Sequence, residues 1–420
     1  QEWIRSQNEY TNSNLVEDDN FLSLSKELEK NLESDDFKNT IIANGRYFHR
    51  ERKAGEDQSV LYVKYQIDGE PKKLIDPNGI KEGNTITMDY WTISPDGKYV
   101  AYGLSEDGAE MATLYVKDVD SGEDLSEEIS RCRYSCIHWL SDSSGFYYTR
   151  NPRPGEVPEQ DEHMYVRVFM HILGEDPSSD TMIFGEGRPK DDMISIKLSL
   201  DDRYLAITAT QSWDRNDVFI YVTETKELKE LFVGLSAKIY PSFLGEKVLL
   251  VTNHGANNYK VLAEPISNMF IPIEKWDEFI PESEHHLGFI TKSSKTVFAG
   301  YTENVCAKVK TFDYEGSPTG ELPIPKHSSI AGINANGREE EYFYSIVSFT
   351  FPRTQYRYNP TTQKTELYRK SDNPINPEDY QVQQEWFQSM DGTKVPAFIL
   401  HRKDINRSTS QPLILYGYGG

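Results

Sequence analysis

The sequence predicts a mostly all-β protein: a seven-bladed β-propeller with helices before it and the start of a second sheet domain after it. Two observations lead to this fold class. From about Ile41 onward, short Tyr-, Val- and Phe-rich runs are broken by Gly, Asp, Asn and Pro roughly every 8 to 12 residues, which is typical of strands and turns. These runs also recur at a spacing of about 49 residues over most of the 420-residue chain.

Residues 1 to about 35 differ from the rest and are predicted to be helical. Their apolar positions follow a helical period, with Trp3 and Ile4 in one group and Leu24, Leu28 and Leu32 in another. The alternation of apolar and polar residues expected of a strand does not occur there. We therefore expect a helical segment ahead of the β-rich region.

The repeat is a short β-rich run followed by a polar turn. Seven such runs have anchor residues that are 53, 53, 52, 41, 48 and 47 residues apart. Because a blade of four antiparallel strands occupies about 50 residues, seven anchors predict seven blades. The alternative is a Tyr-rich sandwich or barrel, but single cores stop growing beyond about 250 to 300 residues. The anchors are Tyr62, Tyr115, Val168, Ile220, Val261, Val309 and Tyr356.

A second pattern marks turns that lead into strands. Residues 94–101 (Ser-Pro-Asp-Gly-Lys-Tyr-Val-Ala) and 199–206 (Ser-Leu-Asp-Asp-Arg-Tyr-Leu-Ala) share it, and residues 141–147 are a looser copy. Asp-Gly and Asp-Asp favour tight turns. Each copy is therefore expected to deliver an aromatic residue into a buried strand.

The pattern changes again after Lys370. Residues 371–377 contain two prolines and are predicted to be a linker. Three runs follow, and Asp391-Gly392 is expected to form a hairpin turn between the first two. The second and third runs are apolar, of the kind buried on both faces of a mixed sheet, so a second domain is expected to begin here. The three runs cover residues 384–387, 395–400 and 412–416.

Composition excludes several classes of protein. The chain has 45 Lys+Arg against 67 Asp+Glu, a net charge of −22, which argues against nucleic-acid binding because phosphate neutralisation needs clustered positive charge. No stretch reaches the roughly 18 to 20 apolar residues of a membrane span. Three cysteines cannot form a secreted disulfide framework, so a reducing, cytoplasmic compartment is expected.

One cysteine pair invites a metal interpretation. Cys132 and Cys136 are four residues apart and His138 is nearby. A zinc site needs four ligands in paired spacing, and the sequence offers no second pair. We therefore predict buried packing for these residues, and neither a metal nor an organic cofactor.

Two C-terminal stretches resemble a known family. Residues 389–396 (Ser-Met-Asp-Gly-Thr-Lys-Val-Pro) and 413–420 (Leu-Ile-Leu-Tyr-Gly-Tyr-Gly-Gly) resemble the entry into the α/β-hydrolase domain of prolyl oligopeptidases. The resemblance implies a seven-bladed propeller inserted in an α/β-hydrolase domain, of which only the helical arm and first strands are present. The implied parts are the arm at 1–38, the propeller at 39–372, and the linker with the start of the hydrolase domain at 373–420.

A serine peptidase of this fold needs a nucleophile in a Gly-x-Ser-x-Gly turn. The sequence has no such motif, and Gly234-Leu235-Ser236-Ala237-Lys238 lacks the second glycine. The resemblance places the Ser, Asp and His beyond Gly420, so the chain alone is expected to be inactive. Since it starts at Gln1 without a Met and stops straight after an apolar run, we expect it to be part of a longer protein.

Two tyrosines are candidate site residues. The resemblance assigns Tyr418 the role of donating its hydroxyl to the oxyanion, whereas spacing alone favours simple packing at a strand end. Tyr147 matches a position that can face the substrate pocket, but a core aromatic is an equal alternative. The Pro-, Glu- and Gly-rich residues 151–162 are predicted to be a long loop, matching the family loop that helps control entry.

The resemblance thus implies a serine endopeptidase that cleaves short peptides after proline. The propeller would exclude folded proteins, and the expected partners are short proline-containing peptides, with the protein a monomer. Two alternatives stay open. One is an oligopeptidase B-like enzyme that cleaves after basic residues, and the other is a non-catalytic propeller that serves as a binding module.

Overall fold

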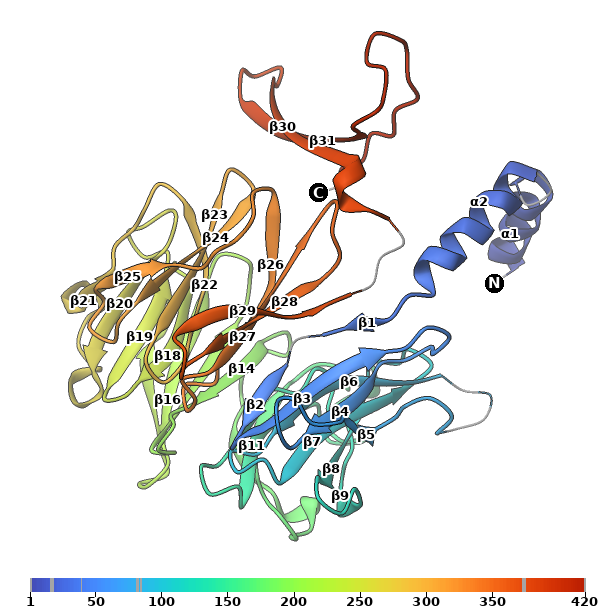
Figure 1. The fold of residues 1–420 in the computed structure, drawn as a ribbon. Helices are drawn as coiled ribbons and strands as arrows, with labels where there is room; N and C mark the ends of the chain where they lie inside the picture. The colour runs from blue at the N-terminus through green and yellow to red at the C-terminus, as the bar shows by residue number, and fades with distance from the viewer. Residues whose placement is uncertain are drawn as a thin grey trace.

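The main body of the protein is a ring of seven antiparallel sheets (Figure 1), which confirms the predicted seven-bladed β-propeller. The structure, a computed structural model, describes residues 2–15, 19–38, 40–80, 83, 85–371 and 375–418. Neighbouring blades contact one another in sequence order, and the last blade returns to the first.

Each blade is a meander of four consecutive strands, and blade 1 has one additional short strand. The strands are, for blade 1, β1 (Asp36–Phe37), β2 (Ile41–Ala43), β3 (Arg46–Arg52), β4 (Val60–Lys64) and β5 (Lys72–Ile75); for blade 2, β6 (Ile86–Ile93), β7 (Tyr99–Glu106), β8 (Thr113–Asp118) and β9 (Asp124–Ile129); for blade 3, β10 (Ile137–Trp139), β11 (Gly145–Arg150), β12 (Arg167–Ile172) and β13 (Thr181–Phe184); for blade 4, β14 (Met193–Leu198), β15 (Tyr204–Thr210), β16 (Asn216–Val222) and β17 (Glu227–Phe232); for blade 5, β18 (Ile239–Leu244), β19 (Lys247–Thr252), β20 (Lys260–Pro265) and β21 (Asp277–Ile280); for blade 6, β22 (His286–Lys292), β23 (Val297–Glu303), β24 (Cys306–Phe312) and β25 (Pro318–Glu321); and for blade 7, β26 (Ser328–Asn334), β27 (Tyr342–Ser348), β28 (Thr354–Asn359) and β29 (Lys364–Lys370).

The seven sequence anchors all lie on the third strand of a blade, from Tyr62 on β4 to Tyr356 on β28. The repeat therefore marks one strand in each blade, as predicted. Burial follows the same order within each blade. All six residues of β11, a second strand, are buried, whereas all four residues of β25, a fourth strand, are exposed. Middle strands are covered on both faces by neighbouring blades, and fourth strands form the outer rim.

The repeated turn pattern is a side-chain network that joins the first and second strands. In blade 2, the Ser94 hydroxyl donates to Asp96 Oδ1 (2.7 Å) and accepts from the Tyr99 amide (2.9 Å). In blade 4, Ser199 bonds Asp201 (2.7 Å) and the Tyr204 amide (3.0 Å) in the same way. As expected, each turn leads a tyrosine into a largely buried strand. Tyr99 and Tyr204 begin β7 and β15 and are half-buried, and the residues that follow them are buried.

The antiparallel meander defines two faces of the ring. Turns between first and second strands, such as residues 94–98 and 199–203, lie on one face, which we call the lower face. Turns between second and third strands lie on the opposite, upper face. The chain enters the ring and leaves it on the upper face, because blade 1 begins with a first strand and blade 7 ends with a fourth.

The ring closes through side chains, since among the described residues no sheet mixes strands from the two ends of the ring. Blades 1 and 7 meet along a seam that combines an apolar cluster with buried polar contacts. The Thr40 hydroxyl donates to Gln355 Oε1 (2.8 Å), and both residues are buried. The Tyr47 hydroxyl donates to Glu341 (3.1 Å), and Arg369 pairs with the buried Glu51.

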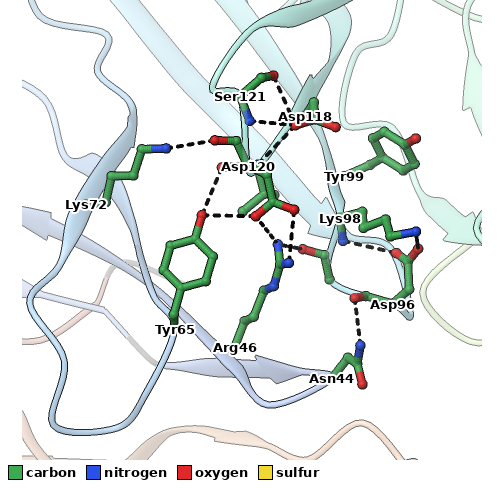
Figure 2. Close-up of polar contacts among 12 residues, drawn as sticks. Asn44, Arg46, Tyr65, Lys72, Asp96, Lys98, Tyr99, Asp118, Asp120 and Ser121 are labelled. Carbon is green, nitrogen blue, oxygen red and sulfur yellow. Dashed lines mark hydrogen bonds and ion pairs between the residues drawn. The ribbon is translucent and has the colours of Figure 1, made fainter.

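Blades 1 and 2 are joined at the lower rim by the contacts in Figure 2. Arg46 of β3 forms an ion pair with Asp120 (3.0 Å) and donates to the Gly97 carbonyl (3.1 Å). Its guanidinium also lies over the Tyr65 ring, 5.1 Å from the centroid. The hydrogen bond from Arg46 is the main reason why the pKa of Asp120 is lowered. One side chain thus ties two blades together.

Replacing Arg46 with Met should lower the free energy of unfolding by only about 1 kcal/mol, because Asp120 is largely exposed and water screens the pair. Urea unfolding of the variant measures this loss. Arg5→Met is the matched control, since Arg5 is exposed on the first helix, and it should leave the midpoint unchanged. A loss above about 3 kcal/mol for Arg46→Met would contradict the weak surface role argued here.

The predicted N-terminal helices are confirmed as α1 (Glu2–Leu15) and α2 (Asp19–Leu32), and the predicted hairpin is β30 (Tyr380–Gln388) with β31 (Lys394–Arg402). Both segments stand out from the ring (Figure 1). They expose large apolar side chains, which on a folded protein mark interaction surfaces. These side chains include Trp3, Leu24, Leu28, Leu32, Trp386, Phe387, Val395 and Leu400.

Two expectations for the C-terminal runs are wrong. Residues 412–416 form no strand, and Leu413, Ile414, Leu415 and Tyr416 are exposed. Residues 395–400 are a strand, but one that is exposed or half-buried. A strand forms only where a neighbouring strand can pair with it by hydrogen bonds. It is buried only where other elements pack on both faces of its sheet. In the part of the chain that the structure describes, β30 and β31 pair only with each other. The predicted linker lies partly outside the described residues, at 372–374.

Candidate functional site

The first strands of the blades line a central channel. Towards the lower face it contains a cavity of about 250 Å³ bordered by β2, β6, β10 and β14. A second cavity of about 180 Å³ is bordered by β10, β14, β18 and β22. His138, Leu198 and Leu200 line both cavities, so the two are continuous parts of one channel.

Residues 335–339, between β26 and β27, cross the lower end of this channel. Asn336 donates to the Ile42 carbonyl of blade 1 (2.8 Å), and the Gly337 amide donates to the Lys292 carbonyl of blade 6 (3.0 Å). Arg338 reaches the Leu200 carbonyl of blade 4 (3.1 Å). Blade 4 lies across the ring from blade 7, so this crossing segment spans the opening. Residues 339–341 follow the crossing and lead into β27.

Gly337 lets the crossing segment lie close to the channel wall. Its φ is +75°, a left-handed conformation that side chains rarely adopt. A Cβ on this residue would lie 3.0 Å from Lys292 Cε and 3.5 Å from Leu200 Cδ1. A larger residue at 337 would therefore strain the backbone and push the segment away from blades 4 and 6.

The upper face carries the β30–β31 hairpin. Phe398 of β31 packs against Phe349, with ring centroids 5.1 Å apart, and against His327 at 5.7 Å. Gln384 of β30 donates to the Asn304 carbonyl (2.7 Å). The hairpin therefore rests on the ends of blades 6 and 7, and the chain that follows it leads to Tyr418.

Tyr418 is 92 % exposed and lies in irregular backbone. The two glycines that complete its motif, Gly419 and Gly420, lie outside the described residues. The simple alternative of packing at a strand end does not describe Tyr418 in this structure. Its role as an oxyanion donor remains a prediction.

Tyr147 lies in a different place. It is 5 % exposed, belongs to the core cluster between blades 3 and 4, and meets Tyr221 edge-on with ring centroids 6.4 Å apart. Burial, helped by Tyr221 and Asp202, raises the pKa of Tyr147 to about 12. The structure therefore does not bring Tyr147 and Tyr418 into one site, and it gives Tyr147 the surroundings of a core aromatic.

Tyr147→Phe distinguishes the two interpretations of Tyr147. We expect a change in unfolding free energy below about 1 kcal/mol, because the ring that fills the core is kept. The peptide hydrolysis that the sequence resemblance implies for the longer protein should also stay unchanged. Thermal unfolding and kcat/KM on one sample measure both quantities. A large fall in kcat/KM without a change in Tm would instead show that the hydroxyl faces the substrate.

The predicted loop from Asn151 to Glu162 connects β11 to β12 and contains only the short 3₁₀ turn Glu159–Asp161. Arg131 holds both ends of the loop, donating to the Pro152 carbonyl (2.9 Å) and to the Glu162 carbonyl (2.5 Å). The loop connects a second strand to a third, so it lies on the upper face with the hairpin. A domain that covers the upper face would therefore lie beside this loop.

The residues considered for a metal site do not converge. Cys132 is buried between blades 2 and 3, where burial raises the pKa of its thiol to about 12, and this confirms the predicted packing. Cys136 packs against the next cluster, between blades 3 and 4, and His138 lines the channel. Among the described residues, no group of three or more His, Cys, Asp or Glu side chains is arranged to hold a metal ion. Within the same residues, no helix is long and apolar enough to cross a membrane.

Lys197 and Lys292 are channel residues that the sequence did not single out. They lie at or next to the lower ends of β14 and β22, and both line the 180 Å³ cavity. The available signal was weak: each is a lysine at or near the end of a strand, where polar residues are common. Only the ring brings the two blades together.

The seven-bladed ring with the β30–β31 hairpin on its upper face places the chain in the class of β-propeller proteins. A family model described as the prolyl oligopeptidase N-terminal beta-propeller domain matches residues 1–371. The chain belongs to the prolyl oligopeptidase family.

Individual relatives agree with this family. A prolyl endopeptidase of Elizabethkingia meningoseptica is 29 % identical over 383 residues, covering 90 % of this chain and 53 % of that protein. Prolyl oligopeptidase A of Galerina marginata is 30 % identical over 381 residues, covering 83 % of this chain and 50 % of that protein. A structure solved in a structural and mechanistic study of two prolyl endopeptidases superposes with a TM-score of 0.89 at 29 % identity, covering 96 % of this chain and 60 % of that chain. The chain thus spans about half the length of the curated relatives it matches.

Proposed function

We propose that this chain is the propeller and the entry into the catalytic domain of a serine endopeptidase that cleaves short peptides on the carboxyl side of proline. The observation that carries the proposal is the agreement of the relatives, which are named prolyl endopeptidase or prolyl oligopeptidase and align over 83 to 90 % of the chain. Their names favour the proline-specific branch over an oligopeptidase B-like enzyme. In this proposal the arm is residues 1–38, the propeller 39–372, and the start of the hydrolase domain 373–420.

The exposed apolar surface supports a larger catalytic domain. The apolar side chains of α1, α2 and the β30–β31 hairpin need cover, and further strands and helices of a hydrolase domain would supply it. Residues 412–416 would then gain the neighbouring strands that they lack here. The arm and the hairpin would become parts of one domain above the ring.

The propeller would restrict access to the active site. The crossing segment 335–339 obstructs the lower end of the channel, where it bonds blades 1, 4 and 6. Peptides would then reach the chamber at the upper face, beside the loop at residues 151–162. Folded proteins would be too large for this route, so only short extended peptides would be cleaved.

The proposed chemistry is acyl transfer. A serine of the catalytic domain would attack the carbonyl that follows proline, with a histidine carrying the proton and an aspartate orienting the histidine. Tyr418 would donate its hydroxyl to the oxygen that becomes negative in the tetrahedral intermediate. No metal or organic cofactor takes part. We also propose a monomer in the cytoplasm, in keeping with the three free cysteines at positions 132, 136 and 306.

Intact mass and a peptidase assay on the protein isolated from its source test the proposal. We expect a mass of about 75 to 80 kDa, which a propeller with a complete hydrolase domain needs, and cleavage of a chromogenic Gly-Pro substrate. A matched Gly-Arg substrate should not be cleaved. Cleavage after Arg alone would favour the oligopeptidase B-like alternative, and no turnover of either substrate would favour a binding module.

A further inference from the structure

Two lysines face the central channel without an acidic partner. Lys197 of blade 4 and Lys292 of blade 6 line the same 180 Å³ cavity. Among the described residues, no carboxylate lies within ion-pair distance of either ammonium group, although acidic residues outnumber basic ones by 67 to 45 in this chain. Lys197 keeps access to water and Lys292 is half-buried, yet neither has a counter-charge in the channel, so this pair needs an explanation.

The electrostatics of the cavity favour a bound anion. Burial in the channel lowers the pKa of both lysines, and Lys197 lowers the pKa of Lys292 further, to about 8. The two positive charges therefore repel each other across the channel. An anion between them would remove this repulsion and form charge-assisted hydrogen bonds, which are stronger than neutral ones.

Other groups around the cavity are compatible with an oxyanion. Ser242 and Thr291 line it and offer hydroxyl donors. Burial lowers the pKa of His138 to about 3, so its ring is neutral, and burial raises the pKa of the Cys136 thiol, which is also neutral. The carboxylate of Glu339 borders the adjoining cavity instead. Water reaches Lys197, so the site is open to small solutes.

We propose that Lys197 and Lys292 form a binding site for a small oxyanion at the lower end of the propeller channel. Two ammonium groups and two hydroxyls around one cavity are donors suited to a small oxyanion group such as phosphate or a carboxylate. The oxyanion has two chemical sources: a free inorganic ion, or the terminal carboxylate of a peptide in the channel. The site rests on the channel geometry and does not depend on the proposed peptidase activity.

Calorimetric titration with inorganic phosphate at constant ionic strength tests the site. We expect binding to the wild type, about 10- to 100-fold weaker binding to Lys197→Met and to Lys292→Met, and retained binding to Lys292→Arg. Lys364→Met is the matched control, because Lys364 is exposed on the outer strand of blade 7. Without phosphate, each channel Met variant should melt at or above the wild-type temperature, because it removes a repulsion.

A second titration identifies the source of the oxyanion. It compares a short peptide ending in a free proline carboxylate with the same peptide as its amide. Binding of the acid but not the amide, lost in Lys197→Met, would support the peptide carboxylate as the ligand. Phosphate binding without peptide binding would support the free ion. Absence of binding by phosphate and by the acid, or an equal loss in Lys364→Met, would overturn the site.

Discussion

In the proposed peptidase, replacing Tyr418 with Phe should lower kcat by about 100- to 1000-fold while KM changes little. This is the usual effect of removing one hydrogen-bond donor to a developing oxyanion, because the donor acts mainly in the transition state. The aromatic ring is kept, so the variant tests the hydroxyl alone. Steady-state kinetics on a Gly-Pro substrate measure kcat and KM separately.

Tyr416→Phe is the matched control for this experiment. Tyr416 lies two residues earlier in the same segment and is 88 % exposed, close to the 92 % of Tyr418. We expect its kcat to equal that of the wild type. Equal kcat values for Tyr418→Phe and Tyr416→Phe would exclude Tyr418 from the oxyanion site and leave it a packing role in the completed domain.

Replacing Glu51 with Gln should lower the free energy of unfolding by about 3 to 5 kcal/mol, the typical cost of removing one partner from a buried ion pair. Glu51 is 4 % exposed and lies at the seam between blades 1 and 7. It pairs with Arg369 and Lys53, and its Oε2 is 3.4 Å from His49 Nε2. Urea unfolding measures the loss, and Glu230→Gln, exposed on β17, should show none.

The same variant should change the response to acid. Burial opposes ionisation of Glu51, but hydrogen bonds from His49, Lys53 and Arg369 outweigh it and hold its pKa well below the ordinary 4.5. A lowered pKa stabilises the folded state above the unfolded-state value, and this stabilisation is lost as pH falls below about 4.5. The difference between wild type and Glu51→Gln should therefore shrink from pH 4.5 downward. A constant difference would show that the carboxylate is not stabilised at the seam.

Local chemistry explains why so much of the ring could be predicted. The seven anchors mark third strands because a short run of β-branched and aromatic residues that ends in a polar turn is recognisable within a few residues. The turns at 94–98 and 199–203 were recognisable because Ser, Asp and the following tyrosine amide bond one another within a few residues. The helices and the hairpin were likewise determined by periodicity and by a two-residue turn signal.

Features that depend on distant residues were missed. The run 412–416 has the composition of a buried strand, yet it forms none without neighbouring strands. Tyr147 had two equal interpretations, and the packing of Tyr221 from the next blade gives it core surroundings. Residues 335–339 cross the channel to blade 4, where Arg338 contacts the Leu200 carbonyl 138 positions away.

The sequence by itself determined the number of blades, one strand in each blade and the family to which the chain belongs, because these follow from short-range patterns and motifs. Only the tertiary structure decided how the ring closes, what obstructs its lower end and which side chains share the channel. Thr40 and Gln355 are 315 positions apart and in contact. Lys197 and Lys292 lie on different blades, and only the curvature of the ring places both at one cavity.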